Sequence, residues 1–560
     1  MTAPAMARRE WLWVLLIWLA AMLIAFREPV WSGFDLGFGD RADAIIEISL
    51  LEHWRNVLAG YSTWNAPIYF HPHSGTLGYN DGYFLYGLVY SFWRLWFDPF
   101  LSDTLNAATF KTIGFFASWW LTRRTLGWQA PVALLVAAIF TISNAMAIHA
   151  VHAQLQSVGL IPVAMILATG AARAQVAGLT MRARMAGIVL ALLMAAWLVT
   201  AYYMAWFTLW FGCVFVLCWL IASGNWRPGD ALRLLRAHGA TLAICFAAFA
   251  VAVIPFLSVY LPKAGESGGH GYWKMLGYLV TPVDLVNTGP GNLLWGWINS
   301  GMRALLGQFA PDPDLPRRVF GGEHESGFPV LLFILTVTAL WQVLRRRVQA
   351  DPVLLAFAMA IAASWLLTIQ LWVVSPWGAV FHLVPGAKGL RVVLRYQIFL
   401  ILPVLLIVAA VYRHRLMALL ADRRATGMAL VALLLVEQLN SGSSAQLSRS
   451  AYWTPLTAIP APPAGCRSFY AVQTRIGEPI YRSAAMHGKH PHNDDSMLLA
   501  QLWRVPTLGG YSTFQPRDWV FADPLKPDYD ARVRRYIESH RLKGVCRLDV
   551  RDAQPWQRIN

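Results

Sequence analysis

The sequence predicts a polytopic all-α membrane protein with about eleven transmembrane helices, followed by a small α/β domain outside the membrane. Its 560 residues are 57% hydrophobic and only 14% charged, and the mean hydropathy is +0.45, which excludes an ordinary soluble protein. Arginines gather in short clusters between apolar runs, as they do in the cytoplasmic loops of membrane proteins. After Asn440 the composition becomes polar and proline-rich, which indicates that the chain leaves the membrane there.

The arginine clusters set the expected topology. The net charge of +16 does not indicate a nucleic-acid surface, because the basic residues are divided among these clusters. With the clusters in the cytoplasm, the N-terminus lies inside and the C-terminus outside. No small-residue cleavage site follows the first apolar run, so we expect that run to be retained as an anchor in the bacterial cytoplasmic (inner) membrane. The predicted spans are 11–26, 104–122, 130–149, 155–170, 186–201, 203–221, 240–260, 329–344, 353–374, 396–412 and 427–440.

Two regions need a separate interpretation. Tyr83–Phe97 is apolar but short, and as a span it would move Arg123 and Arg124 to the outside. We therefore expect it to form a membrane-associated helix on the outer face. The uninterrupted apolar stretch 186–221 is too long for one span, and we expect it to break near Thr200–Met204.

The large and polar connecting segments all lie on the predicted outer face, at 27–103, 149–154, 261–328 and 375–395. We therefore expect the chemistry there, where ATP is not available. The sequence contains neither a P-loop nor a dinucleotide-binding fingerprint. The segment 261–328 is rich in glycine and aromatic residues, includes His270, and is expected to form a flap at the rim of a site for a sugar or lipid.

The first outer segment begins with four acidic residues close to the membrane, Asp35, Asp40, Asp43 and Glu47. Asp40 precedes a run in which apolar residues recur every three or four positions, which predicts a helix over Asp40–Leu58 lying on the membrane surface. Two interpretations of Asp40 remain open. It is either the N-cap of this helix or a catalytic carboxylate.

Histidines and a further aspartate accompany these acids. His71, His73 and Asp81 lie in a short irregular segment, where they would complete a substrate site or a divalent-metal site for Mg²⁺ or Mn²⁺ with Asp40 and Asp43. Turn formation is the alternative explanation for this segment, and Asp81 is favoured as a further acidic group rather than the histidines as ligands. His149 and His152 share one outer turn and are candidates for the rim of the site.

A basic segment on the outer side opposes the general charge pattern. Lys388, Arg391 and Arg395 follow one another at helical spacing in 382–397. Arginines at this spacing just above a bilayer can hold a lipid phosphate through paired hydrogen bonds. The alternative is ordinary contact with anionic head groups.

The residues after Asn440 predict a linker, 441–465, and a soluble outer domain, 466–560. Strand-like runs at Ser468–Val472 and Gly544–Leu548, with a helical segment at Tyr529–His540, predict a small α/β unit. Cys466 and Cys546 nearly bracket this domain and would form a disulfide in an oxidising compartment. The histidine-rich tract 487–495 is a weaker candidate for metal binding.

The layout resembles the GT-C superfamily of polyprenol-phosphate-dependent membrane glycosyltransferases, which includes relatives of protein O-mannosyltransferases and lipid A aminoarabinose transferases. The resemblance lies in the first span, the Gly39–Asp40 motif at the head of a surface helix, and the multi-span body over 1–440. The run Pro385–Tyr396 and the segment 506–519 are similar to uncharacterised YfhO-like bacterial membrane proteins. The resemblance implies transfer of a sugar from a polyprenyl-phosphate donor to a glycan, lipid or protein acceptor, with inversion and with Asp40 as the base. Relatives often carry an Asp-Glu pair where this chain has Asp40–Arg41, so Asp43 would be the second acid.

Two other classes compete with a transferase. A lipid or glycan transporter would carry functional charges within its spans, whereas here only Lys111 and Glu437 interrupt them. A non-catalytic membrane scaffold with an outer recognition domain would not need the acidic first outer segment.

Overall fold

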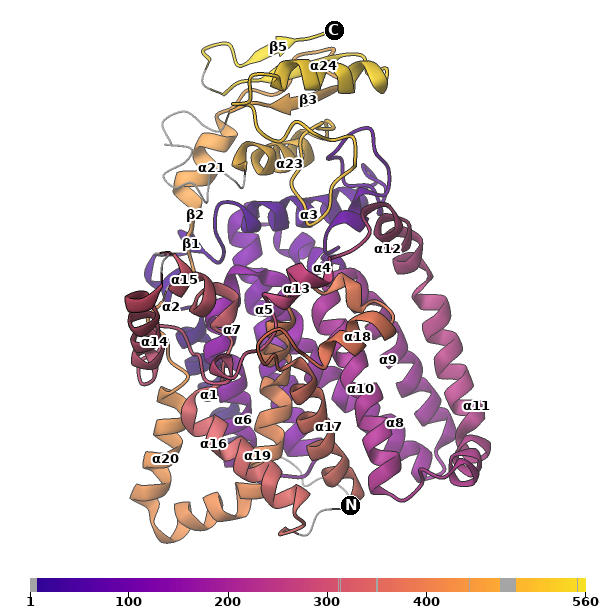
Figure 1. Cartoon of the computed structure of the whole chain (residues 1–560), viewed down its shortest axis with the longest axis vertical. Coiled ribbons are helices and arrows are strands. Elements are labelled where there is room, and N and C mark those ends of the chain that lie inside the picture. Colours follow the sequence, from indigo (N-terminus) through magenta and orange to yellow (C-terminus); the bar gives the residue numbers. More distant parts are fainter. Residues whose placement is uncertain are drawn as a thin grey trace.

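Long helices run side by side through the body of the protein, and a smaller unit covers one end of it (Figure 1). The computed structural model describes residues 8–310, 312, 314–348, 351–442, 444–473, 490–550 and 552–560. Each predicted span falls on a helix of the body. These helices are α1 (Arg8–Ala25), α5 (Pro99–Trp120), α6 (Ala130–Ile142), α8 (Ile161–Val176), α9 (Thr180–Thr200), α10 (Tyr202–Ala222), α11 (Pro228–Ala252), α16 (Val330–Leu344), α17 (Pro352–Thr368), α19 (Tyr396–Asp422) and α20 (Arg424–Val436).

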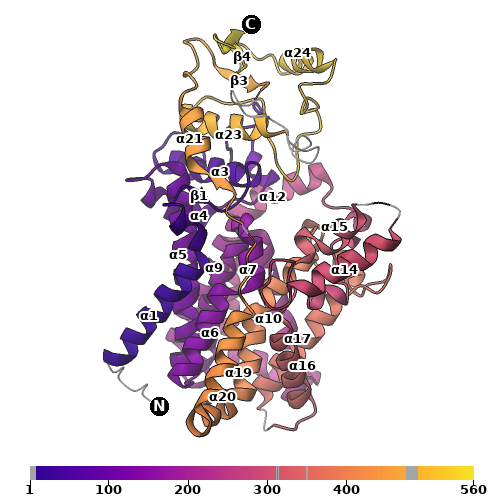
Figure 2. The ribbon, with the colours of Figure 1, turned by 90° about the vertical axis from the view of Figure 1, so that its left-hand side faces the viewer.

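Six helical stretches of the described chain are long and apolar enough to cross a bilayer: 130–151, 153–176, 180–200, 202–222, 228–252 and 393–422. Four shorter apolar helices accompany them, at Phe84–Trp93, Val330–Leu344, Pro352–Thr368 and Arg424–Val436. The predicted class is confirmed: the chain is a largely helical membrane protein. The C-terminal end of the chain lies at the end of the long axis that the smaller unit covers (Figures 1 and 2).

The predicted interruption of the 186–221 stretch is confirmed at Ala201, between α9 and α10. Its backbone is extended, with φ −153° and ψ 101°. The Tyr202 N–H is left outside α9 by this break and donates to the Asp81 carboxylate at 2.8 Å. The break therefore joins two body helices to the first outer segment.

Shorter helices cover the body on the side of the C-terminal unit. They are α2 (Arg27–Trp31), α3 (Asp43–Leu58), α4 (Phe84–Trp93), α7 (Asn144–Ile148), α12 (Ile254–Ser267), α13 (Tyr272–Leu276), α14 (Gly296–Phe309), α15 (Leu315–Phe320) and α18 (Trp377–Leu383). α4 corresponds to the short apolar segment that we expected to lie on the outer face. α14 and α15 project to one side of the body (Figure 2).

The helix predicted over Asp40–Leu58 is present, but its setting differs from the prediction. α3 begins at Asp43, and most of its polar side chains are buried. Glu52 and His53 are buried, Glu52 against α4, where Tyr90 and the following Arg94 donate to its carboxylate. α23 (Pro491–Trp503) of the C-terminal unit also packs against α3. Asn56 of α3 donates to the Gln501 side chain at 3.0 Å. Amphipathic spacing does not distinguish a face covered by another domain from a face covered by solvent.

The C-terminal unit contains the predicted α/β elements. Its sheet has the order β3 (Ser468–Ala471), β4 (Val545–Leu548) and β5 (Trp556–Arg558), with β3 parallel and β5 antiparallel to β4. α24 (Tyr529–Ser539) occupies the predicted helical segment. A disulfide joins Cys466 to Cys546, as the cysteine placement predicts.

The segment predicted as a linker is partly structured. It contains β2 (Leu447–Ser448) and α21 (Arg449–Thr457). β2 pairs antiparallel with β1 (Leu36–Gly37) of the first outer segment. Arg449 also forms an ion pair with Asp98, just before α5. The first outer segment is thus attached at two places to the segment that leads into the C-terminal unit.

One of the two charges within the predicted spans has a structural explanation. The Glu437 carboxylate accepts the Leu331 and Leu332 N–H groups, each at 3.1 Å, and the Trp295 indole N–H at 3.1 Å. The two backbone groups belong to the first turn of α16, which has no partners within its own helix for them. Glu437 therefore caps a neighbouring helix.

Candidate active site

Residues from all four predicted outer segments meet around one carboxylate, Glu323, which lies in a short 3₁₀ turn (Gly322–His324). The His152 ring lies between two acids, with Nδ1 3.5 Å from the Asp43 carboxylate and Nε2 3.4 Å from Glu323. His149 Nδ1 lies 3.8 Å from Glu323. Arg395 binds Glu323 through Nε at 3.0 Å and through a second guanidinium nitrogen. We name these five residues the Glu323 network.

The ion pair of Glu323 and Arg395 is the buried part of the network. The two side chains are 15% and 7% exposed. Burial alone would raise the pKa of Glu323, but Arg395 and His152 outweigh it and hold this pKa well below its ordinary value. The carboxylate is therefore ionised at neutral pH. The Arg395 guanidinium also lies over the Tyr203 ring, 5.2 Å from its centre.

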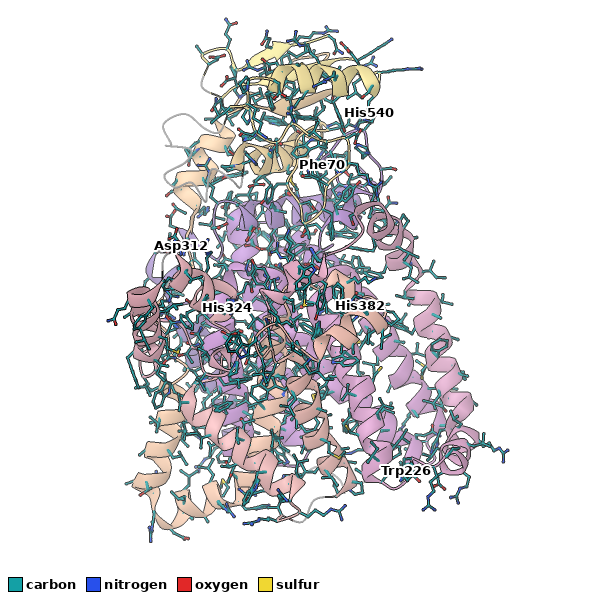
Figure 3. The ribbon with its side chains drawn as sticks, in the orientation of Figure 1. Phe70, Trp226, Asp312, His324, His382 and His540 are labelled. Atoms are coloured by element: carbon teal, nitrogen blue, oxygen red, sulfur yellow. A yellow bond between two sulfur atoms is a disulfide. The ribbon has the colours of Figure 1, made fainter. Side chains whose placement is uncertain are left out.

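Local contacts fix the turn that carries Glu323. His324 Nδ1 lies 3.1 Å from both oxygens of the buried Asp284. Asp284 in turn accepts the backbone and hydroxyl groups of Thr281, each at 2.8 Å. Figure 3 labels His324, which lies in the body, below Phe70 and below the C-terminal unit in that view.

Asp40 lies beside the network and holds the start of α3. One of its carboxylate oxygens accepts the N–H groups of Ala42 and Asp43, each at 2.9 Å, in the turn that leads into α3, although the N-cap position itself is occupied by Ala42 rather than by Asp40. Gly39 precedes it with φ +91°, and a Cβ at this position would lie 2.6 Å from that of Ala44. The Gly39–Asp40 motif therefore has a steric reason, because only glycine permits this turn. Capping does not exclude catalysis by the same carboxylate.

Asp81 is half-buried at the other side of the first outer segment. It accepts the Tyr202 N–H, and burial raises its pKa despite this hydrogen bond and the nearby Arg395. The Asp43 side chain is 40% exposed and can therefore be reached from solvent.

The predicted phosphate-binding residues divide into two settings. Arg395 is paired in the network, whereas Arg391 is half-buried and Lys388 is exposed. The Tyr203 hydroxyl accepts the Arg391 N–H at 2.8 Å, and the Lys388 carbonyl accepts the His270 N–H at 3.1 Å. Burial and the charge of Arg391 lower the pKa of His270 to about 4, so this ring is neutral at pH 7.

The histidines of the first outer segment lie elsewhere. His73 contacts Asp518 and His540 of the C-terminal unit. His71 lies near His73 and His540. Over the described ranges of the chain, His73, Asp518 and His540 are the one group whose metal-ligating atoms all lie within 4.8 Å of one another. The structure therefore does not gather His71, His73 and Asp81 with Asp40 and Asp43. Of the tract 487–495, residues 487–489 lie outside the described residues.

Sequence reasoning missed the central residue of the site. Glu323 lies in a glycine-rich segment without periodicity, where no spacing rule assigns a role to it. It also missed a second polar group beneath α3, where Glu47, Asp103, Asn106, Lys111 and Gln156 line one narrow cavity. Burial and the neighbouring Asp103 carboxylate raise the pKa of Glu47 well above its ordinary value.

Fold and site together define a polytopic membrane protein with a charged network beneath its C-terminal unit. No protein-family model matches the sequence, and no curated protein matches it. Among solved structures, the chain is similar to the crystal structure of ArnT from Cupriavidus metallidurans in the apo state. The identity is 13%, the match covers 96% of this chain and 93% of that chain, and the TM-score is 0.35.

Proposed function

We propose that the protein is an inverting membrane glycosyltransferase, which moves a sugar from a polyprenyl-phosphate donor to a glycan, lipid or protein acceptor on the outer face. The observation that supports this proposal most is the meeting of acidic, imidazole and guanidinium groups from four separate outer segments around Glu323. A scaffold would not require these charges to be gathered. The proposal assigns no step to a metal ion and involves no nucleic acid.

The reaction needs a base for the acceptor hydroxyl, which is a weak nucleophile at neutral pH. In the proposed mechanism a first-segment aspartate, Asp40, takes this proton while the hydroxyl oxygen attacks the anomeric carbon. The bond from that carbon to the donor phosphate breaks, and the sugar is transferred with inversion. Two backbone N–H groups fix the orientation of the Asp40 carboxylate, as the positioning of a base requires. Asp43 and His152 border the space in which the acceptor would lie.

The leaving group is a lipid phosphate, whose negative charge needs cations nearby. Arg391 and Lys388 are the accessible cations of the basic segment, and we assign the phosphate to them. Arg395 is already paired with Glu323, so its proposed role is to hold Glu323 and, through it, His152. The polyprenyl chain would lie in the surrounding membrane lipids.

Exchanging Asp40 for asparagine separates capping from catalysis. Asparagine caps a helix about as well as aspartate but cannot accept the proton of the acceptor. Asp40→Asn is expected to accumulate normally and to lose roughly a hundredfold or more of its transfer rate. The measurement is sugar transfer by purified protein, supplied with a panel of polyprenyl-phosphate sugars and envelope acceptors.

Asp43→Asn, measured beside it, distinguishes the two acids. A wild-type rate for Asp40→Asn with an inactive Asp43→Asn would move the base to Asp43. Arg391→Ala should raise the KM for the lipid donor more than it lowers kcat, because it removes a phosphate contact. Transfer by none of the donors, with all charged residues intact, would overturn the glycosyltransferase proposal.

We also propose that the network faces the outside of a bacterial cytoplasmic (inner) membrane, with the N-terminus in the cytoplasm. A phosphatase reporter, which is active only outside the cytoplasm, should be active when fused after Gly465 and inactive when fused after Arg124. The reverse result at either position would contradict this topology.

A further inference from the structure

A histidine–aspartate–histidine group joins the first outer segment to the C-terminal unit, away from the Glu323 network. His73 Nε2 lies 3.0 Å from one oxygen of Asp518, and His540 Nε2 lies 2.7 Å from the other. The rings of His73 and His540 are 5.3 Å apart at an angle of 75°. His540, which follows α24, is labelled near the far end of the molecule in Figure 3.

Well-packed neighbours hold the three residues in place. Phe70 is fully buried, lies 5.0 Å from the Trp519 ring, and accepts the His73 N–H at 2.9 Å. The Tyr536 hydroxyl of α24 donates to the His71 carbonyl at 3.0 Å. His73 is therefore positioned by Phe70, and Asp518 by the neighbouring Trp519. The three ligating side chains converge from a preorganised frame.

We propose that His73, Asp518 and His540 bind one divalent transition-metal ion, and that this ion is zinc. The bound ion would link the first outer segment to the C-terminal unit. Two imidazoles and one carboxylate form a ligand set that zinc accepts in proteins, and tetrahedral coordination places such ligand atoms roughly 3.3 Å apart. The present separations of 3.0 and 2.7 Å need only a small opening.

The charge and exposure of the group fit the same conclusion. Two neutral imidazoles and one carboxylate carry a net charge of −1, which a dication reverses. Asp518 is 47% exposed, so an ion can enter from solvent and a water molecule can complete the coordination. Imidazole ligands favour zinc over Mg²⁺ or Mn²⁺, which take oxygen ligands. The site is thus distinct in position and in ligand chemistry from a metal site built on the first-segment aspartates.

Cobalt provides the direct test, because tetrahedral Co²⁺ absorbs in the visible range. Full-length protein, purified in detergent and stripped with chelator, is titrated with Co²⁺ and then with Zn²⁺. Wild type should bind one ion per chain with the absorption of a tetrahedral site, and zinc should displace the cobalt. His540→Gln and His73→Gln should each weaken binding by roughly tenfold or more.

His71→Gln and His490→Gln are the matched controls. The first changes a histidine of the same loop that is not among the three ligands, and the second changes the histidine-rich tract of the C-terminal unit. Both should bind cobalt as wild type does. Zinc should also raise the thermal unfolding temperature of wild type and of both controls, but not that of His540→Gln.

Two results would overturn the proposal. One is the absence of saturable cobalt or zinc binding to wild type at micromolar concentrations. The other is equal binding by wild type, His73→Gln and His540→Gln, which would move the metal to other residues. Neither outcome depends on transfer activity, so failure of the glycosyltransferase proposal leaves this test intact.

Discussion

Arg395→Ala is expected to destabilise the protein more than any other single exchange in the network. The substitution leaves the Glu323 carboxylate ionised and buried without its main partner. Breaking a buried ion pair by removing one member costs about 3–5 kcal/mol in other proteins. We therefore expect a marked fall in the thermal unfolding midpoint of the purified protein in detergent.

A double exchange and an exposed control make this result interpretable. Replacing both partners, in Glu323→Gln with Arg395→Met, removes the unpaired charge and should recover a large part of the lost stability. Arg317→Ala in α15 changes an exposed arginine and should shift stability by about 0.5 kcal/mol or less. An Arg395→Ala protein as stable as wild type would show that Glu323 does not depend on this pair.

Loss of the disulfide is the second large effect. Cys466 and Cys546 are 80 residues apart in the sequence. In the chain-entropy description, closing a loop of this length stabilises the folded state by about 4 kcal/mol. Replacing both cysteines by alanine should therefore make the C-terminal unit sensitive to limited proteolysis at temperatures at which wild type resists it.

Reduction of wild type should reproduce the effect of the double exchange. Cys213→Ala, which removes an exposed free thiol from α10, should leave the cleavage rate unchanged. If reduced wild type and the double variant both resist protease as oxidised wild type does, the disulfide contributes little to the stability of this unit.

The parts of the fold that were predictable depend on local signals. The arginine clusters and apolar lengths located every body helix, and the excess length of 186–221 required the break found at Ala201. The predicted strands and the cysteine pair also agree with the sheet and its disulfide. His149 and His152 were recognisable as neighbours because they share one turn.

The contacts between distant segments were not predictable in this way. Glu323 becomes central only because the turn at Gly322–His324 lies against both His152 and Arg395. Arg395 was expected to face a lipid phosphate, and its pairing with Glu323 is a tertiary contact that helical spacing cannot indicate. His73 and His540 are in contact although they are far apart in the sequence, and neither histidine alone indicates a metal site. The burial of Asn56 similarly involves α23, which lies far away in the sequence, because Asn56 donates to Gln501.

The position of α3 between the body and α23 limits where the chain can be truncated and which substitutions it can accept. A truncated chain ending near 440 would lack β2, the partner of β1, and would expose Asn56 and its buried polar neighbours to water. The C-terminal unit is therefore not a detachable module, and gene fusions or domain exchanges must retain it together with the first outer segment. Substitutions on the facing sides of α3 and α23 should accordingly be accepted in pairs rather than singly.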